Sequence, residues 1–252
     1  CRPEPMDKLL YVAMSGAKQA FATQAVINHN VANASTTGFR TDLHAMASRP
    51  IWGAGFPTRV NPLLVGNEWD RSTGALQTTG RDLDVAIRGA GFIAVQGRDG
   101  TEAYTRAGDL QLDAEGRLVT ASGHPVLGQQ GPIVIPANTG IQIGGDGTIS
   151  IVAQGQGPET VSAIDRIKLV RPDVDRLTKG VDGLLRLPDG EAADADADAQ
   201  LATGSIEASN VNIAEAMIDM ILVARHYETQ VRMMDVANEN AGAAQRLVAP
   251  AG

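Results

Sequence analysis

The sequence has a single cysteine, Cys1, among its 252 residues. One cysteine allows neither a disulfide framework nor a cysteine metal site within a chain. Aromatic residues make up only 4% of the chain, so large aromatic cores and stacking platforms for nucleic-acid bases are scarce. The formal net charge of −8 also argues against a nucleic-acid backbone as the partner. We therefore expect no nucleic acid among the partners of this protein.

Long apolar runs are missing too. The longest one, residues 214–224, is interrupted by Glu215 and Asp219, so the sequence predicts no membrane insertion. The N-terminal part lacks the continuous apolar core and the cleavage site of a secretory signal peptide. Residues 1–5 precede Met6 and share no pattern with the residues after it, and we expect them to be an upstream remnant outside the fold.

One glycine-rich motif invites a nucleotide-binding interpretation. Gly89, Gly91 and Ala94 match the G-x-G-x-x-A dinucleotide fingerprint. That motif requires a helix to open at its second glycine, whereas the residues after Gly91 have the pattern of a strand. We therefore expect a tight β turn at this position and no bound nucleotide.

Other motifs for chemistry are absent from the sequence. The alternating aspartates of residues 194–198 lack the glycine and the bidentate glutamate of a calcium loop. The four histidines have no spacing typical of metal ligands, and no serine lies in a G-x-S-x-G context. We predict no catalytic residue, no metal site and no cofactor, and hence a protein that is not an enzyme.

The C-terminal part carries a sustained heptad pattern. Stepping alternately by four and three residues from Ile213 reaches Met217, Met220, Ala224, Tyr227, Val231, Met234, Asn238 and Ala241. This period is typical of a coiled-coil helix, which we predict over residues 210–248. Asn212 can cap its start, with Glu215 placed to reach back to the amide of Asn212. Polar seam residues such as Asn238 usually fix register, so the seam predicts one specific partner.

A second helix is predicted at the other end of the chain, over residues 6–37. The same spacing selects Leu9, Ala13, Gly16, Ala20, Ile27 and Asn30, and a neighbouring apolar face includes Phe21 and Val31. Two adjacent apolar faces suit a helix with more than one neighbour. Gly16 is tolerated in a helix interior where a second backbone comes close. The pattern leaves a helical hairpin on a globular core and helices that pack between chains equally open.

The residues between the helices change character. Residues 38–68 contain Pro50, Pro57 and Pro62 and predict an extended connector. Residues 69–188 alternate with a period of two, which indicates short strands of an antiparallel sandwich or open barrel. Residues 189–209 predict an exposed acidic loop and a return connector. The predicted fold class is α+β, with long N- and C-terminal helices paired as a coiled-coil-like domain around an inserted, mainly antiparallel β domain.

Three blocks of this sequence resemble the bacterial flagellar rod and hook protein family. Residues 24–40, QAVINHNVANASTTGFR, are similar to the N-terminal signature of that family. Residues 74–87, GALQTTGRDLDVAI, with Gly91-Phe92 and YTRAG at 104–108, resemble a second block. SNVNI at 209–213, running into RHYE at 225–228, resembles the third. The blocks follow the order of the family, and the opening residues 6–17 are similar to its proximal rod members.

The resemblance implies a structural axial component of the flagellar basal-body rod in the periplasm. It implies helical assembly through the terminal helices to transmit torque, with copies of itself and other rod proteins as partners. It also implies passage through the flagellar type III export apparatus without a cleaved signal peptide. We expect the assembly interface to consist of the heptad and face residues named above, between Leu9 and Val31 and between Ile213 and Ala241. Two alternatives stay open, namely another rod or hook member, and a non-flagellar β-domain binding module dimerised by its helices.

Overall fold

The computed structural model describes residues 7–50, 60–153 and 161–248, and the chain divides into two compact units. Unit 1 combines the segments Cys1–Ala32, Asp42–Glu68 and Asn212–Gly252, and unit 2 combines Asn33–Thr41 and Trp69–Val211. The chain therefore crosses between the units after residues 32, 41, 68 and 211. Residues 1–5, expected to be an upstream remnant, lie outside the described residues.

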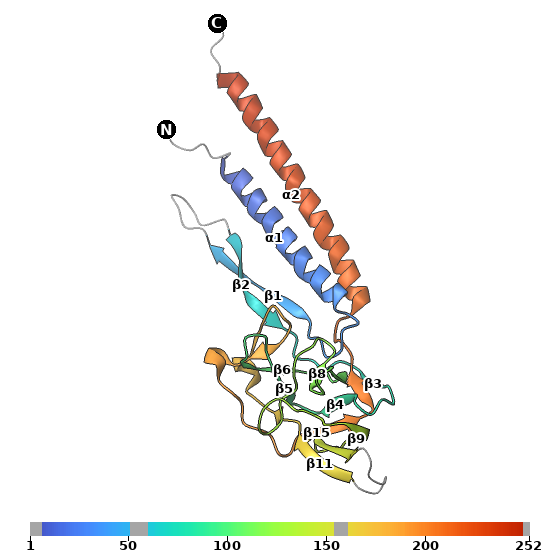
Figure 1. The fold of residues 1–252 in the computed structure, drawn as a ribbon. Helices are drawn as coiled ribbons and strands as arrows, with labels where there is room; N and C mark the ends of the chain where they lie inside the picture. The colour runs from blue at the N-terminus through green and yellow to red at the C-terminus, as the bar shows by residue number, and fades with distance from the viewer. Residues whose placement is uncertain (1–6, 51–59, 154–160, 249–252) are drawn as a thin grey trace. The chain divides into compact units, whose positions relative to one another are not determined.

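Two long helices dominate unit 1 (Figure 1). Helix α1 spans Asp7–Ala32 and helix α2 spans Ile213–Val248, and they lie side by side in antiparallel directions. This pairing, with antiparallel strands between the two helices in the chain, confirms the predicted α+β class. Helix α1 ends earlier than expected, and Gly38 closes the turn behind it in the left-handed region at φ 66°.

Residues 38–68 are not a simple extended connector. Strand β1, Asp42–Pro50, and strand β2, Val60–Trp69, form a two-stranded sheet. The sequence pattern did not predict these strands, because the segment contains prolines and proline is normally excluded from a sheet interior. Each strand of a two-stranded sheet has an outer edge where a missing N–H costs nothing, and Pro50 and Pro62 lie within β1 and β2.

Unit 2 is built from short strands. They are β3 (Leu76–Thr78), β4 (Val85–Arg88), β5 (Phe92–Gln96), β6 (Glu102–Thr105), β7 (Leu110–Leu112), β8 (Leu118–Thr120), β9 (Asn138–Ile143), β10 (Thr148–Ala153), β11 (Val161–Arg166), β12 (Leu169–Val170), β13 (Thr178–Lys179), β14 (Leu185–Arg186), β15 (Gln200–Thr203) and β16 (Ser205–Glu207). The 3-10 turns η1 (Val174–Arg176) and η2 (Pro188–Gly190) lie among them.

These strands form small antiparallel sheets. The largest has the order β12-β5-β6-β14-β13, and a second has the order β11-β10-β9. The remaining strands pair as β7 with β8, β15 with β4 and β16 with β3. After the turn at Gly89 and Gly91 the chain enters strand β5, as the sequence predicted, and not a helix.

The prediction of an exposed loop and return connector over residues 189–209 is partly wrong, because the second half of this segment forms strands that pair with other strands of unit 2. Strand β15 aligns Leu201 with Ile87 of β4, and β16 aligns Ile206 with Gln77 of β3. Strands of three or four residues are too short to carry a clear alternation in the sequence. The last strands of unit 2 therefore close against two of its first strands.

The core of unit 2 is aliphatic, as the low aromatic content indicated. Its central side chains are inaccessible to solvent and include Val85, Ile93, Leu110, Leu118 and Ile149. A smaller cluster surrounds Trp69 and Phe92, whose rings meet edge to face at 6.4 Å between centroids. Trp69 thus anchors the start of the long segment of unit 2 in its core.

Gly108 allows a close backbone approach inside unit 2. Its carbonyl oxygen accepts a 2.9 Å hydrogen bond from the Val85 N–H, and a Cβ atom on Gly108 would overlap the Val85 carbonyl oxygen. A backbone carbonyl in a strand cannot move aside as a flexible side chain can. Only glycine therefore fits at position 108, where the backbone lies against the start of β4.

We expect Gly108→Ala to lower the free energy of unfolding by about 2–4 kcal/mol, since the backbone must shift to admit the methyl group. Urea unfolding of the purified chain measures the change. Gly140→Ala is the matched control, because Gly140 lies in β9 and a Cβ atom there meets nothing within 4 Å. Equal effects of the two substitutions would contradict this assignment.

Aspartate carboxylates hold several turns of unit 2. The carboxylate of Asp146 accepts a 2.6 Å hydrogen bond from the Thr148 hydroxyl, which lowers the pKa of Asp146. The carboxylate of Asp182 accepts hydrogen bonds of 2.6 and 2.9 Å from Arg186, which lower the pKa of Asp182. A carboxylate with a lowered pKa in the folded state stabilises that state in its ionised form.

Asp182→Asn should therefore destabilise the chain at neutral pH but not in acid. The contribution of Asp182 is complete above the ordinary aspartate pKa of roughly 3.9 and is lost as the pH falls through the lower folded value. We expect a loss of about 1 kcal/mol at pH 7 that shrinks below about pH 3. Urea unfolding at both pH values measures it, with the exposed Asp194→Asn as control. A loss of the same size at both pH values would count against the assignment.

Candidate assembly site

The predicted assembly residues divide into two groups on the helices of unit 1. Eleven are buried or half-buried, namely Ala13, Gly16, Ala20, Ile27, Asn30, Val31, Met220, Ala224, Val231, Met234 and Ala241. Five are exposed, namely Phe21, Ile213, Met217, Tyr227 and Asn238. Leu9 lies in α1, outside the residues whose side chains are described. One set of predicted residues therefore contains both the contact within the hairpin and a surface that the chain leaves open.

Small side chains let the two helices approach. Ala13, Ala17 and Ala20 of α1 are buried, and α2 contributes the buried Ala237. A Cβ atom on Gly16 would lie only 2.8 Å from the side-chain Cδ and Oε1 atoms of Gln230. The sequence predicted a close backbone at Gly16, but the neighbour is this side chain. Gly16 thus marks the level at which α1 meets Gln230.

The face of α2 toward α1 differs in phase from the predicted seam. Ala216, Met220 and Val223 are half-buried along the first turns, whereas Ile213 and Met217 are at least half exposed. A heptad pattern places the large apolar residues in the contact, but small residues on α1 favour a face that also includes Ala216 and Ala237. Large apolar residues are consequently left on the outer side of α2.

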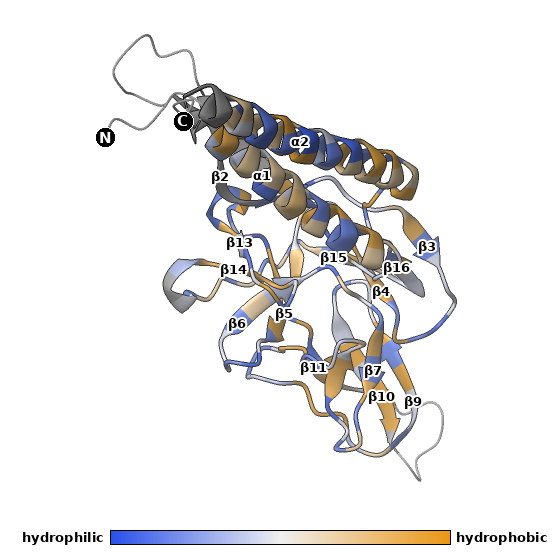
Figure 2. Cartoon of the chain, turned by 90° about the horizontal axis from the view of Figure 1, so that it is seen from above, coloured by the Kyte–Doolittle hydropathy of each residue, from blue (hydrophilic) through white to orange (hydrophobic). Residues whose placement is uncertain are grey.

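Five of the exposed apolar residues of α2 gather at its beginning, whereas Tyr227, Met233 and Val236 lie farther along. We call these five the α2 patch; they are Ile213, Met217, Ile218, Ile221 and Leu222, each between 50% and 59% exposed. Figure 2 shows orange, hydrophobic residues on this part of the helix. The half-buried face of these turns is also apolar, and the exposed Glu215 and Asp219 are the charged residues that interrupt the apolar surface. An exposed apolar patch of this kind normally marks an interaction surface.

Asn30 has a partner within unit 1. Its Nδ2 donates to the Asp42 carbonyl oxygen at 2.9 Å, and the Asp42 N–H donates to Asn30 Oδ1 at 2.9 Å. His29 Nδ1 lies 2.7 Å from the Asp42 carboxylate. These contacts attach the last turn of α1 to the start of β1. The amide group of Asn30 is therefore satisfied without a neighbouring copy.

The start of α2 is capped largely as predicted. The Glu215 N–H donates to Asn212 Oδ1 at 3.4 Å, and the Ala216 N–H donates to the Asn212 carbonyl oxygen at 2.9 Å. The Glu215 carboxylate reaches the Asn212 side-chain amide, at 3.4 Å, and not its backbone N–H as the capping-box pattern predicted.

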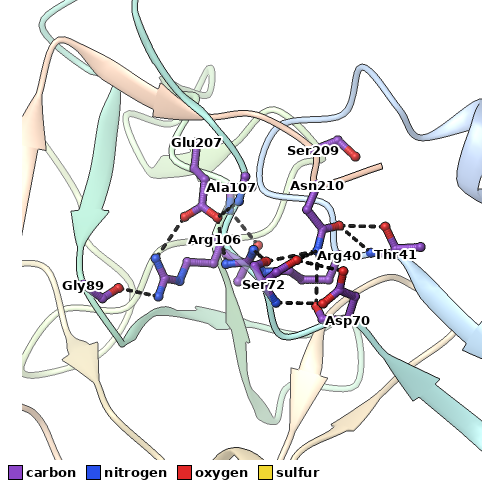
Figure 3. A network of polar contacts seen from close by, with 12 residues as sticks. Arg40, Thr41, Asp70, Ser72, Gly89, Arg106, Ala107, Glu207, Ser209 and Asn210 are labelled. Carbon is purple, nitrogen blue, oxygen red and sulfur yellow. Dashed lines mark hydrogen bonds and ion pairs between the residues drawn. The ribbon is translucent and has the colours of Figure 1, made fainter. Parts of the chain in front are cut away.

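The sequence did not reveal a buried charge cluster in unit 2 (Figure 3). The carboxylate of Glu207 is shared by Arg40 Nη2 at 2.7 Å and Arg106 Nη1 at 2.9 Å, and the three side chains are at most 5% exposed. The Gly74 N–H adds a 2.9 Å hydrogen bond to Glu207 Oε1, and Arg106 Nη2 donates to the Gly89 carbonyl oxygen at 2.7 Å. Burial lowers the pKa of both arginines, and Glu207 opposes that change.

Asn210 extends the cluster to the chain crossings. Its Oδ1 accepts hydrogen bonds from the Thr41 N–H and hydroxyl group, both at 2.8 Å, and its Nδ2 donates to the carbonyl oxygens of Asp70 and Ser72. Thr41, Asp70 and Asn210 each lie within two residues of a crossing. We call Arg40, Arg106, Glu207 and Asn210 the junction cluster. Inside unit 2, the hydrogen bonds of Asn210 thus link the chain segments next to three crossings, those after residues 41, 68 and 211.

Among the described residues, no group of three or more histidine, cysteine, aspartate or glutamate side chains is placed to hold a metal ion. Within the same residues, neither long helix has the unbroken apolar length that a bilayer crossing requires.

Comparison with known proteins assigns the family. The family models described as Flagella basal body rod protein, Flagellar hook protein FlgE/F/G D1 domain and Flagellar basal body rod FlgEFG protein C-terminal match residues 10–40, 86–151 and 202–247. Over 249 residues the chain is 41% identical to the flagellar basal-body rod protein FlgF of Escherichia coli, covering 96% of this chain and 99% of that protein. The chain belongs to the flagellar basal-body rod protein family.

Further relatives agree. The rod protein is 40% identical over 249 residues to FlgF of Salmonella typhimurium, covering 96% of this chain and 99% of the relative. It is 33% identical over 260 residues to the flagellar basal-body rod protein FlgG of Bacillus subtilis, covering 93% and 96%. The predicted resemblance is confirmed, and the rod protein is a structural component of the flagellar basal body.

The junction cluster connects the three matched segments. Arg40 lies in the first segment, Arg106 in the second, and Glu207 and Asn210 in the third. Arg40, Arg106 and Asn210 also lie inside the blocks that carried the resemblance. Periodicity could not reveal them, because a charge that is buried only through a distant partner has no local pattern.

We expect Glu207→Gln to cost about 3–5 kcal/mol of unfolding free energy, because it leaves two buried guanidinium groups without their counter-charge. Chemical unfolding of the purified rod protein measures the loss. Glu115→Gln is the control, since Glu115 is exposed in a turn, and its effect should stay within about 0.5 kcal/mol. A loss for Glu207→Gln as small as that of the control would show that the cluster does not stabilise unit 2.

Proposed function

We propose that this rod protein assembles helically with copies of itself and with other flagellar rod proteins through α1 and α2, and that the assembled shaft transmits torque. The role is structural and involves no catalysis. The α2 patch carries this proposal. Its five large apolar side chains are each at least half exposed and require covering, and a neighbouring subunit of the rod supplies that cover.

The predicted interface residues fit this role in two ways. The half-buried group, such as Ala20 and Met234, forms the hairpin that presents the surface. The exposed group, such as Phe21 and Met217, provides apolar area for neighbouring subunits. Fully burying one such side chain contributes about 1.5–3 kcal/mol, so several of them per copy support an ordered assembly.

Unit 2 and the junction cluster support the transmission of load. Thr41, Asp70 and Asn210 lie next to the points where the chain leaves for unit 1, and hydrogen bonds join them to each other. A force on the helices reaches these bonds through the covalent chain. The buried ion pairs of Glu207 then hold the same segments in a packed β unit and not in a loose linker.

The route to the rod forms part of the proposal. We propose passage as an unfolded chain through the flagellar type III export apparatus, without a cleaved signal peptide, to a periplasmic location. The unit 2 core is aliphatic and needs no disulfide, since the sequence has only Cys1. The fold can therefore form after passage without any step of disulfide formation.

The double variant Ile218→Asp with Leu222→Asp tests the assembly role. Two carboxylates in the α2 patch should abolish swimming of a host strain that lacks its own copy of the gene, because each buried unpaired charge costs about 2–5 kcal/mol at an interface. Swimming in soft agar and the protein content of isolated basal bodies are the measurements. Thr229→Asp, exposed farther along α2, should leave swimming unchanged.

Unfolding curves of the purified variants separate assembly from folding. Both variants should unfold at the urea concentration of the original chain, since the changed side chains are exposed. Normal swimming with Ile218→Asp and Leu222→Asp in place would overturn the proposed assembly through α2.

A further inference from the structure

The outer side of α2 changes character along its length. Its first turns carry the α2 patch, whereas the later exposed positions Arg225, Glu228, Arg232, Asp235 and Glu239 are charged. These charged residues repeat at spacings of three and four, so they share one side of the helix. The continuous apolar part of the outer surface therefore ends near Leu222, and Met233 and Val236 are isolated apolar residues among the charges.

Helix α1 has its outer apolar residues at the opposite end of the hairpin. Tyr11, Met14 and Phe21, which we call the α1 stripe, are 62%, 55% and 71% exposed. Spacings of three and seven residues place them on one side of the helix. Toward the other end of α1 the exposed positions are small or polar, as at Ala25, Asn28 and His29.

The two apolar surfaces lie at different levels. Gly16 lies against Gln230, so the antiparallel pairing brings the α1 stripe level with the charged part of α2. The α2 patch lies level with the last turns of α1. The displacement between stripe and patch is about twelve residues, or about 18 Å at 1.5 Å per residue.

We propose that the α1 stripe of one copy packs on the α2 patch of a neighbouring copy that is shifted by about 18 Å along the helices. This inference rests on the proposed function, because it requires that copies of the chain assemble. The occupant of the α2 patch is thus a second copy of this chain. The shift places Phe21 of one copy opposite Ile213 of the next, and Met14 within one residue of Ile221.

A contact without the shift is chemically worse. Level copies would place Phe21 against Arg225 and Met14 against Arg232, which would take two guanidinium groups out of water next to apolar side chains. Of these α1 residues, only Lys18 would lie opposite a residue of opposite charge, Glu228. In the shifted contact Lys18 lies opposite Ala216, beside the exposed Glu215, and keeps an acidic neighbour.

The shifted contact also propagates. Burial places the stripe and the patch on the sides of α1 and α2 that face away from the partner helix, so each copy has one of each on opposite sides of its hairpin. A contact between two different surfaces leaves one of each free at the ends of any row. Copies joined in this way form an open, stepped row and not a closed dimer.

Pairs of single-cysteine variants test the shift. In a Cys1→Ser background, cells co-express a Met14→Cys copy with an Ile221→Cys copy, and isolated basal bodies are treated with a mild oxidant. We expect a disulfide-linked dimer at least about tenfold more abundant than from Met14→Cys with Arg232→Cys, because residues much farther apart than 7 Å between Cα atoms cannot be bridged. The Arg232→Cys pair is matched, since Met14 and Arg232 lie level.

Each outcome decides between defined alternatives. More dimer from the level pair, or no dimer from either pair in cells that swim normally, overturns the shifted contact while the proposed rod function stands. A cross-linked product of another mass shows that a different protein covers the patch, which also overturns it. Absence of the chain from basal bodies refutes the proposed function and this inference with it.

Discussion

Two guanidinium groups share one carboxylate in the interior of unit 2, and most of the architecture depends on that arrangement. Arg40, Arg106 and Glu207 come from distant parts of the sequence, and none can be buried without the others, because an unpaired buried charge is strongly unfavourable. Their meeting fixes the segment that follows α1, the turn before Gly108 and the strand that precedes α2. Asn210 then ties the neighbouring backbone into the same place.

The rod protein therefore separates two tasks. Unit 2 stabilises itself with an aliphatic core and internal ion pairs. Among the described side chains of unit 1 few are buried, these are mostly small, and large apolar residues such as Phe21 and Met217 are exposed. This division agrees with the proposed assembly through the helices, which requires exposed apolar area on unit 1.

Sequence patterns predicted the long helices and the antiparallel β region because both depend on local periodicity. They failed where a signal is short or non-local. Strand β16 has three residues, and Pro62 in β2 is acceptable only because that sheet has two strands. The heptad pattern identified the pairing of the helices but not its phase, since small residues such as Ala237 decided which side faces inward. Glu207 had no local signal at all.

The order of pairing along the chain has a consequence for how the fold is reached. Strands β15 and β16 close against β4 and β3, which precede them by more than a hundred residues, and Glu207 arrives last among the buried charges. A polypeptide that emerges from any narrow passage with its N-terminus in front thus keeps an open sheet edge and two uncompensated arginines until residue 207 is out. Unit 2 can therefore be completed only after most of the chain has emerged.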